Sequence, residues 1–282
     1  MYLQVQNSKI NSEAVFLPNC LSYLLTGTII RHFPCKIKGL PVNLLNLILF
    51  QCMLTNMQIA AILFLSFALS IIWAFIVIRK ENLSVKPLLY IFLFSFFAVL
   101  ISILMQTIIY FLSQNFLKTA GYTYGILFDC FIHSSLPEET VKALLFSIFV
   151  KLLWSDKMKN MDEITPAQNR VNIRILLLLS VFYGLIFASF ENLAYAIRYP
   201  EAIWLRSFTS NILHACLGVY YLEISMVKNT RQLIKPFLFT WGMHGFYNMF
   251  FSIGSYFVIF GIIIVFFVIL NVVNRYDRFK SN

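Results

Sequence analysis

Three long apolar runs without a charged residue constrain the fold of this chain more than any other feature. They cover residues 57–78, 87–112 and 256–273. An α-helix needs about 20 apolar residues to cross the roughly 30 Å hydrocarbon core of a bilayer, so each run can form one membrane span. Because lipid offers the backbone no hydrogen-bonding partner, runs of this length are predicted to be helical. We therefore predict an all-α, polytopic integral membrane protein.

The composition excludes a soluble globular protein and argues against a nucleic-acid partner. Of the 282 residues, 60% are hydrophobic and 12% are charged, whereas soluble domains average about 25% charged residues. The net charge of +10 comes from basic residues scattered between apolar runs, as expected for loops that set the orientation in a lipid bilayer. The five cysteines form no CxxC pair, so they predict neither a disulfide framework nor a structural zinc site.

Four further apolar segments contain polar residues and bring the predicted number of transmembrane helices to seven, within a range of six to eight. They cover about residues 122–150, 173–197, 207–227 and 236–251. The loops on one side of the seven spans hold fourteen basic residues, and those on the other side hold three. The positive-inside rule places the richer side, and with it the C-terminus, in the cytoplasm.

The first 56 residues allow three interpretations. Residues 40–54 are apolar but short, and three polar side chains interrupt them. They could form an eighth span or an interfacial helix, or translation could start at Met57. No internal repeat is visible. We therefore predict one membrane domain over residues 57–274, preceded by an N-terminal segment (1–56) and followed by a basic cytoplasmic tail (275–282).

Ionisable residues inside the polar segments predict a functional site, because a membrane-buried charge costs free energy. Glu138 and Glu139 are adjacent, and Lys142 lies one helical turn after Glu138, where the two can pair. Ser135 and Glu138 have the spacing of a capping box, which predicts a helix start beside Pro137 within the membrane. Capping does not explain the adjacent Glu139, so we interpret the pair as part of a site.

The other polar segments add a glutamate, two histidines and several amides. His244 and Asn248 are four residues apart, which places both side chains on one face of a helix. At a rise of 1.5 Å per residue, the ionisable groups lie roughly 14–26 Å from the cytoplasmic edge, from mid-membrane to the outer half. Carboxylates and imidazoles at similar depth predict a shared set of metal or water ligands. The carboxylates and imidazoles concerned are Glu138, Glu139, Glu191, His214 and His244, and their polar neighbours are Asn192, Tyr195 and Asn248.

These motifs occur in a recognisable order along residues 137–248. The order is EETVK from Glu138, FENLAY from Phe190, the isolated His214, and HGFYN from His244. Together they resemble the PrsW-type intramembrane proteases, which belong to the superfamily of CAAX prenyl proteases and bacteriocin-processing enzymes. The resemblance implies a peptidase of a bacterial cytoplasmic membrane. It would hydrolyse a membrane-anchored protein, such as an anti-sigma factor, near the outer side of the bilayer.

The resemblance also implies roles for the site residues. Glu138 or Glu139 would be the general base that activates water, and the other would orient it. His214 and His244 would hold this water, either directly or through a divalent metal such as Zn²⁺. The sequence has no HExxH motif of zinc proteases, and it leaves open whether the enzyme is metal-dependent or of the glutamate type.

The remaining residues would assist this chemistry. By the same resemblance, Asn248 would stabilise the oxyanion of the tetrahedral intermediate, and Glu191 would be a further ligand or orienting group. Lys142, Asn192 and Tyr195 would support the site. A proton-coupled transporter is the alternative function, because buried carboxylates and histidines can also relay protons. The absence of an inverted repeat in the sequence favours the protease.

Overall fold

A computed structural model of the chain describes residues 44–159, 166–198, 203–227 and 229–281. Every regular element among these residues is helical and none is a strand, which confirms the all-α prediction. The helices from Ile48 onward belong to one compact unit, Ile48–Asn282. Residues 1–43, which make up most of the predicted N-terminal segment, lie outside the described residues, and the chain is helical from Leu44.

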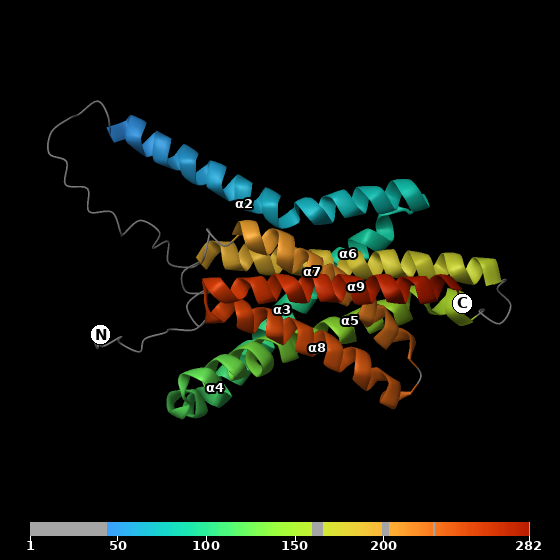
Figure 1. Cartoon of the computed structure of the whole chain (residues 1–282). Coiled ribbons are helices and arrows are strands. Elements are labelled where there is room, and N and C mark those ends of the chain that lie inside the picture. Colours follow the sequence, from blue (N-terminus) through green and yellow to red (C-terminus); the bar gives the residue numbers. More distant parts are fainter. Residues whose placement is uncertain (1–43, 160–165, 199–202, 228, 282) are drawn as a thin grey trace. The chain divides into compact units, whose positions relative to one another are not determined.

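Long helices follow one another along the described chain (Figure 1). Within the compact unit, α6 packs most extensively against α7, while α3 and α5 also pack against each other. The first five elements are α2 (Leu44–Glu81), α3 (Val85–Thr119), α4 (Tyr122–Leu127), the π-helix η2 (Phe128–Ser135) and α5 (Leu136–Lys159). The others are α6 (Pro166–Arg198), α7 (Ile203–Met226), α8 (Thr230–Ile253), the 3₁₀ turn η4 (Ser255–Phe257) and α9 (Val258–Ser281).

Four helical segments among the described residues are long and apolar enough to cross a membrane. They coincide with four of the seven predicted spans, and their bounds are Ile59–Glu81, Val85–Thr119, Val171–Ala196 and Val258–Arg275. The other three predicted spans fall on the segment from α4 to α5, on α7 and on α8, which carry most of the polar site residues. The count of seven spans is therefore not confirmed.

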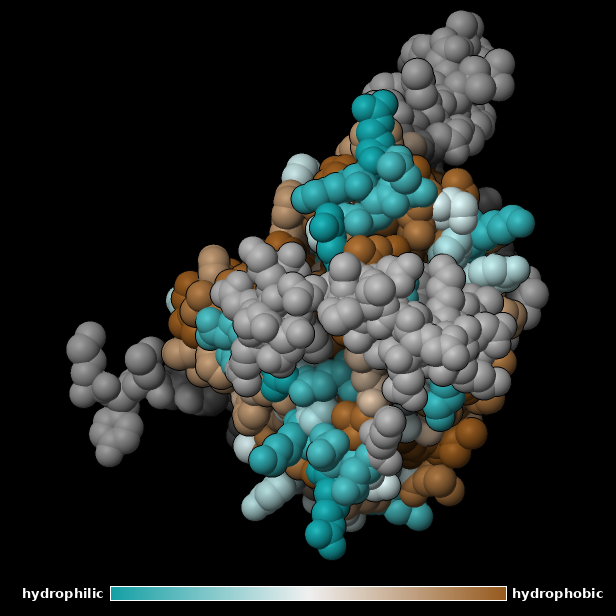
Figure 2. All heavy atoms as spheres, turned by 90° about the vertical axis from the view of Figure 1, so that its right-hand side faces the viewer, coloured by the Kyte–Doolittle hydropathy of each residue, from teal (hydrophilic) through white to brown (hydrophobic). Residues whose placement is uncertain are grey.

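Apolar side chains cover the outside of this helical unit, and polar side chains fill part of its interior. Phe64 on α2, Leu112 on α3 and Phe266 on α9 are 67%, 82% and 62% exposed. By contrast, Glu139 and Lys142 are fully buried. Figure 2 views the right-hand end of Figure 1. Hydrophilic residues gather on this face, and hydrophobic residues lie along its flanks. Exposed apolar surface on this scale marks a surface that contacts lipid or another protein.

Helices α6 and α7 approach closely because glycine stands at two points where their backbones meet. A Cβ on Gly184 would lie 2.0 Å from the backbone oxygen of His214. A Cβ on Gly218 would lie 2.2 Å from the backbone oxygen of Ser180. Small residues allow this kind of close packing between membrane helices. The contact at Gly184 fixes the backbone that carries His214.

The segment before Glu138 forms a π-helical turn that continues into α5, and the predicted capping box is wrong. Leu136 donates its backbone N–H to the carbonyl of Phe131, which is the wider spacing of a π-helix. Ser135 does not cap a helix, because its hydroxyl donates to the Cys130 carbonyl at 2.6 Å. A π turn accommodates Pro137, which would clash with the carbonyl four residues earlier in a regular helix. Short π segments occur frequently at functional sites.

Two ion pairs connect helices at the end of the unit that carries the C-terminus. Arg174 of α6 pairs with Glu81 of α2, and Arg275 of α9 pairs with Glu223 of α7. In Figure 1 the final residues of α2 and α9 and the first residues of α6 lie at this right-hand end. The ends of α2 and α9 and the start of α6, which carry basic residues that the sequence assigns to one side, thus lie at the same end of the unit.

Candidate active site

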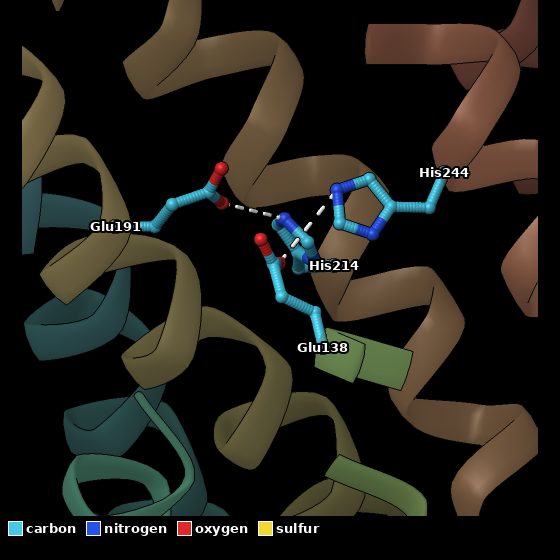
Figure 3. A group of neighbouring side chains, drawn as sticks. All are labelled: Glu138, Glu191, His214 and His244. Atoms are coloured by element: carbon cyan, nitrogen blue, oxygen red, sulfur yellow. Dashed lines mark hydrogen bonds and ion pairs between the residues drawn. The ribbon is translucent and has the colours of Figure 1, made fainter. Parts of the chain in front are cut away.

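Four helices contribute ionisable side chains to one buried cluster. Glu138 comes from α5, Glu191 from α6, His214 from α7 and His244 from α8. One ligand atom from each residue lies within 4.8 Å of the others. Figure 3 shows Glu191 and His244 pointing toward each other from opposite sides, with Glu138 and His214 between them. The predicted convergence of these four residues is therefore present in the structure.

Glu139 is buried with both of its carboxylate oxygens engaged. Its Oε1 lies 2.6 Å from Nζ of Lys142 and 2.8 Å from Nδ1 of His244. Its Oε2 accepts a 2.6 Å hydrogen bond from the hydroxyl of Tyr221. A buried carboxylate with this many close donors is held firmly in one position. Glu139 is thus placed to orient His244 and Lys142.

Glu138 has one engaged oxygen and one that faces the cluster. Its Oε1 accepts hydrogen bonds from Nε2 of Gln106 at 2.9 Å and from Oγ of Ser134 at 3.3 Å. Its Oε2 lies 3.5 Å from Nζ of Lys142 and 3.8 Å from Nε2 of His244. The second distance is too long for a direct hydrogen bond. Of the four carboxylate oxygens of Glu138 and Glu139, Oε2 of Glu138 therefore has the longest contacts.

Lys142 neutralises negative charge at the centre of the site. The side chain is fully buried, and an ammonium group has three N–H donors and no acceptor. Three acceptor atoms surround Nζ: Oε1 of Glu139, Nδ1 of His214 at 3.2 Å and Oε2 of Glu138. The ring of Phe187 lies 4.1 Å away and adds a cation–π contact. Such pairing is what permits a buried lysine to remain charged.

The contacts of His244 fix its proton on Nδ1. This nitrogen faces the Glu139 carboxylate at 2.8 Å, and an ionised carboxylate can only accept. Nε2 therefore carries a lone pair, and Nδ2 of Asn248 donates to it at 3.1 Å. Asn248 also donates to the Ser134 hydroxyl at 3.1 Å. A histidine whose Nδ1–H donates to a carboxylate is oriented as in many metal and proton-transfer sites.

In His214 the carboxylate partner lies at Nε2, whereas in His244 it lies at Nδ1. Its Nδ1 faces the ammonium group of Lys142, and its Nε2 lies 2.9 Å from Oε2 of Glu191. The other oxygen of Glu191 accepts from Nη2 of Arg206 at 2.7 Å. The rings of His214 and His244 meet edge to face, with centroids 4.8 Å apart. The two imidazoles thus stand in contact but are held by different carboxylates.

The cluster of Glu138, Glu191, His214 and His244 could hold a metal ion. Carboxylates and imidazoles are the ligand types that zinc accepts. Bonds of about 2.0–2.2 Å would bring any two zinc ligands within about 4.4 Å of each other, so atoms 4.8 Å apart would have to close in. A water molecule makes hydrogen bonds of about 2.8 Å, and the observed spacing suits it without such movement.

Two predicted site residues, Asn192 and Tyr195, lie beside the cluster and contact residues around it. Asn192 donates to the side-chain oxygen of Asn211 at 2.8 Å, which joins α6 to α7. The ring of Tyr195 lies 3.7 Å from the guanidinium carbon of Arg206. Asn192 therefore stabilises the contact between α6 and α7, and Tyr195 holds Arg206. Sequence reasoning missed several residues that contact the cluster directly or through Glu139, among them Gln106, Ser134, Arg206 and Tyr221.

Comparisons with known proteins assign no family to the chain. No protein-family model, curated protein or solved structure gives a significant match. The resemblance to PrsW-type proteases therefore rests on the motifs in the sequence.

Proposed function

We propose that this protein is an intramembrane endopeptidase that hydrolyses a membrane-anchored protein. The observation that carries the proposal is the buried cluster in which Glu138, His214 and His244 come from three different helices. Hydrolysis needs an activated water and a stabilised tetrahedral intermediate. Carboxylates, imidazoles and an amide within hydrogen-bonding reach of one point provide groups for both tasks.

Glu138 is the general base in this proposal, and Glu139 is the orienting residue. Oε2 of Glu138 has only long contacts, to Lys142 at 3.5 Å and His244 at 3.8 Å. Both oxygens of Glu139 already accept short hydrogen bonds or ion-pair contacts. A base needs an oxygen that can reach the proton it removes. Of these two glutamates, Glu138 is the one with a carboxylate oxygen whose contacts are no shorter than 3.5 Å.

The proposed reaction moves one proton through Glu138. Glu138 takes a proton from water, and the water oxygen attacks the scissile carbonyl carbon. Nδ2 of Asn248, which donates to His244 and Ser134 in the resting site, turns one N–H to the oxyanion that forms, a type of contact worth about 10²–10³ in rate. Glu138 then donates its proton to the leaving amide nitrogen as the C–N bond breaks. Nε2 of His244, which faces Glu138, accepts a hydrogen bond from the water, and His214 holds Lys142 and Glu191 beside it.

A zinc ion, where bound, would be held by Glu138, Glu191, His214 and His244 and would make its bound water more acidic. We propose the glutamate-type reaction because both nitrogens of His214 already have a hydrogen-bonding partner, Nδ1 in Lys142 and Nε2 in Glu191. The 4.8 Å spread of the ligand atoms also suits water better than zinc.

We further propose that the protein lies in a bacterial cytoplasmic membrane with its C-terminus in the cytoplasm. The basic loops at one end of the helices support this orientation through the positive-inside rule. The site residues then lie from mid-membrane to the outer half of the bilayer. A substrate such as a single-span anti-sigma factor would be cut near its outer membrane boundary, where a helix can unwind into the site.

Membrane proteomics on cells that express wild-type protein or Glu138→Gln tests the proposal. We expect a single-span membrane protein to accumulate uncut in the variant and to appear in shortened form in wild-type cells. The new terminus should map to the outer end of its transmembrane segment. Glu223→Gln is the matched control, because Glu223 also pairs with a basic residue but lies outside the cluster.

Two results would count against a protease. Identical membrane proteomes from equally abundant, correctly inserted proteins would remove the main support for proteolysis. Proton uptake into vesicles that depends on Glu138 would favour the proton-coupled transporter, which could use the same buried carboxylates and histidines. Cleavage mapped to the cytoplasmic end of the substrate would contradict the proposed outer position of the site.

A further inference from the structure

Arg206 belongs to the buried site, although its place near the end of an apolar segment suggests a loop residue at the membrane boundary. It lies in the first turn of α7 and is 6% exposed. Arginine side chains are almost never buried without a partner, because the guanidinium group stays charged. The position of Arg206 therefore requires specific contacts, and helix α6 provides them.

Two residues of α6 hold the Arg206 guanidinium group. Nη2 donates to Oε1 of Glu191 at 2.7 Å, and the guanidinium carbon lies 3.7 Å from the ring centre of Tyr195. Glu191 and Tyr195 are one helical turn apart, so they lie on the same face of α6. An ion pair and a cation–π contact together fix both the position and the plane of the group.

The Arg206 contact controls which oxygen of Glu191 faces the site. With Oε1 occupied by Arg206, Oε2 faces Nε2 of His214 at 2.9 Å. On its other side, His214 presents Nδ1 to the Lys142 ammonium group at 3.2 Å. Nδ1 accepts a hydrogen bond from this ammonium group, and Oε2 of Glu191 accepts the proton that then lies on Nε2. The chain from Arg206 through Glu191 to His214 and Lys142 thus permits one neutral tautomer.

We infer that Arg206 is a positioning residue of this site, which acts through Glu191 to hold His214 in the tautomer protonated on Nε2. In the protease reaction, on which the catalytic consequence rests, this tautomer keeps Nδ1 as an acceptor for Lys142, which lies between Glu138 and Glu139. Glu191 is then a positioning residue as well and not a ligand. The tautomer follows from the contacts alone, so it can be tested separately from proteolysis.

Nitrogen NMR of ¹⁵N-histidine-labelled protein in lipid bilayers provides the test. The signals of His214 are identified by their loss in His214→Gln. We expect unprotonated Nδ1 and protonated Nε2 in the wild-type protein. In Arg206→Gln, Glu191 is released and a second His214 tautomer should appear. With a cleavable substrate, kcat should fall about 10–100-fold while KM stays unchanged, as for other residues that orient a functional histidine.

Arg275→Gln is a closely matched control. Arg275 also pairs with a glutamate, Glu223, and its guanidinium carbon lies 4.5 Å from the ring centre of Tyr220. Its loss should leave the His214 signals and kcat unchanged. If Arg206→Gln does not fold, Arg206→Lys serves instead. Lysine keeps the positive charge but lacks the planar guanidinium group that contacts both Glu191 and the Tyr195 ring. A mixture of His214 tautomers is expected there too.

An unchanged His214 spectrum in the folded Arg206 variant would overturn the inference. A changed spectrum in a protein with no proteolytic activity would support the positioning role of Arg206 and count against the proposed function. A fall in both kcat and thermal stability with an unchanged tautomer would assign Arg206 a purely structural role.

Discussion

Glu139 and His244 are 105 residues apart in the sequence, yet Oε1 of one lies 2.8 Å from Nδ1 of the other. This contact joins α5 to α8 and leaves Nε2 of His244 as the acceptor that faces Glu138 and Asn248. It gives the two adjacent glutamates different tasks. Glu139 fixes the histidine, while Glu138 keeps an oxygen directed at the centre of the cluster.

The different environments of the two glutamates predict a difference in stability between their amide variants. Glu139→Gln removes the charge closest to Lys142, and breaking a buried ion pair in this way costs about 3–5 kcal/mol. Glu138→Gln should cost much less, because Oε1 of an amide can still accept from Gln106 and Ser134. Thermal unfolding in detergent should show a large decrease in Tm for Glu139→Gln only.

Both glutamate variants should lose proteolysis, so activity alone does not separate them. Glu138→Gln should remain folded and inactive, as expected for the loss of a general base. Equal unfolding temperatures for the two variants would contradict the division of roles.

Tyr221→Phe should weaken the site through Glu139. The variant removes the 2.6 Å hydrogen bond to Oε2 of Glu139 and leaves a buried carboxylate oxygen without that donor. We expect a loss of about 1–3 kcal/mol in stability and a decrease of about 10–100-fold in kcat. Tyr220→Phe is the control, because the Tyr220 ring stacks on Phe239 outside the cluster. Equal kcat values for the two variants would exclude a role for Tyr221.

Glycine-to-alanine substitutions should have opposite effects at two positions. Gly184→Ala places a methyl group 2.0 Å from the backbone oxygen of His214, so α6 and α7 must separate. We expect a marked decrease in Tm and a loss of activity. Gly242→Ala meets no atom within 4 Å, and its helix should gain about 0.4–1 kcal/mol, because alanine restricts the unfolded chain. A stable, active Gly184→Ala variant would contradict the close contact between α6 and α7.

The sequence predicts the members of the cluster well because each is an ionisable residue in an apolar segment. Glu138, Glu191, His214 and His244 all stand out by this criterion, and the structure brings them together. Contacts between helices are harder to predict. Arg206 stands at the end of an apolar segment, where the sequence alone suggests a loop, and only its packing against α6 shows that it is buried.

Neutral polar site residues and the π-helical turn are harder to predict from the sequence than ionisable residues in apolar segments. Gln106 and Tyr221 belong to residue types that are common in membrane helices for other reasons. The position of Tyr221, two turns after His214 and on the same helix face, is the one sequence feature that could have indicated its role. The spacing of Ser135 and Glu138 fits a capping box as well as a π turn, and only backbone geometry separates the two.

Removal of divalent metal should leave proteolysis intact. This follows from the proposed glutamate-type reaction, in which Nε2 of His214 stays 2.9 Å from Oε2 of Glu191 and the ligand atoms, within 4.8 Å of one another, surround a water. Purified protein treated with a strong chelator should retain its kcat, and metal analysis should find much less than one zinc per chain. His244→Ala should be inactive with or without added zinc. Loss of activity on chelation, its recovery with zinc and one bound zinc per chain would instead establish a metal-dependent protease that uses the same four residues.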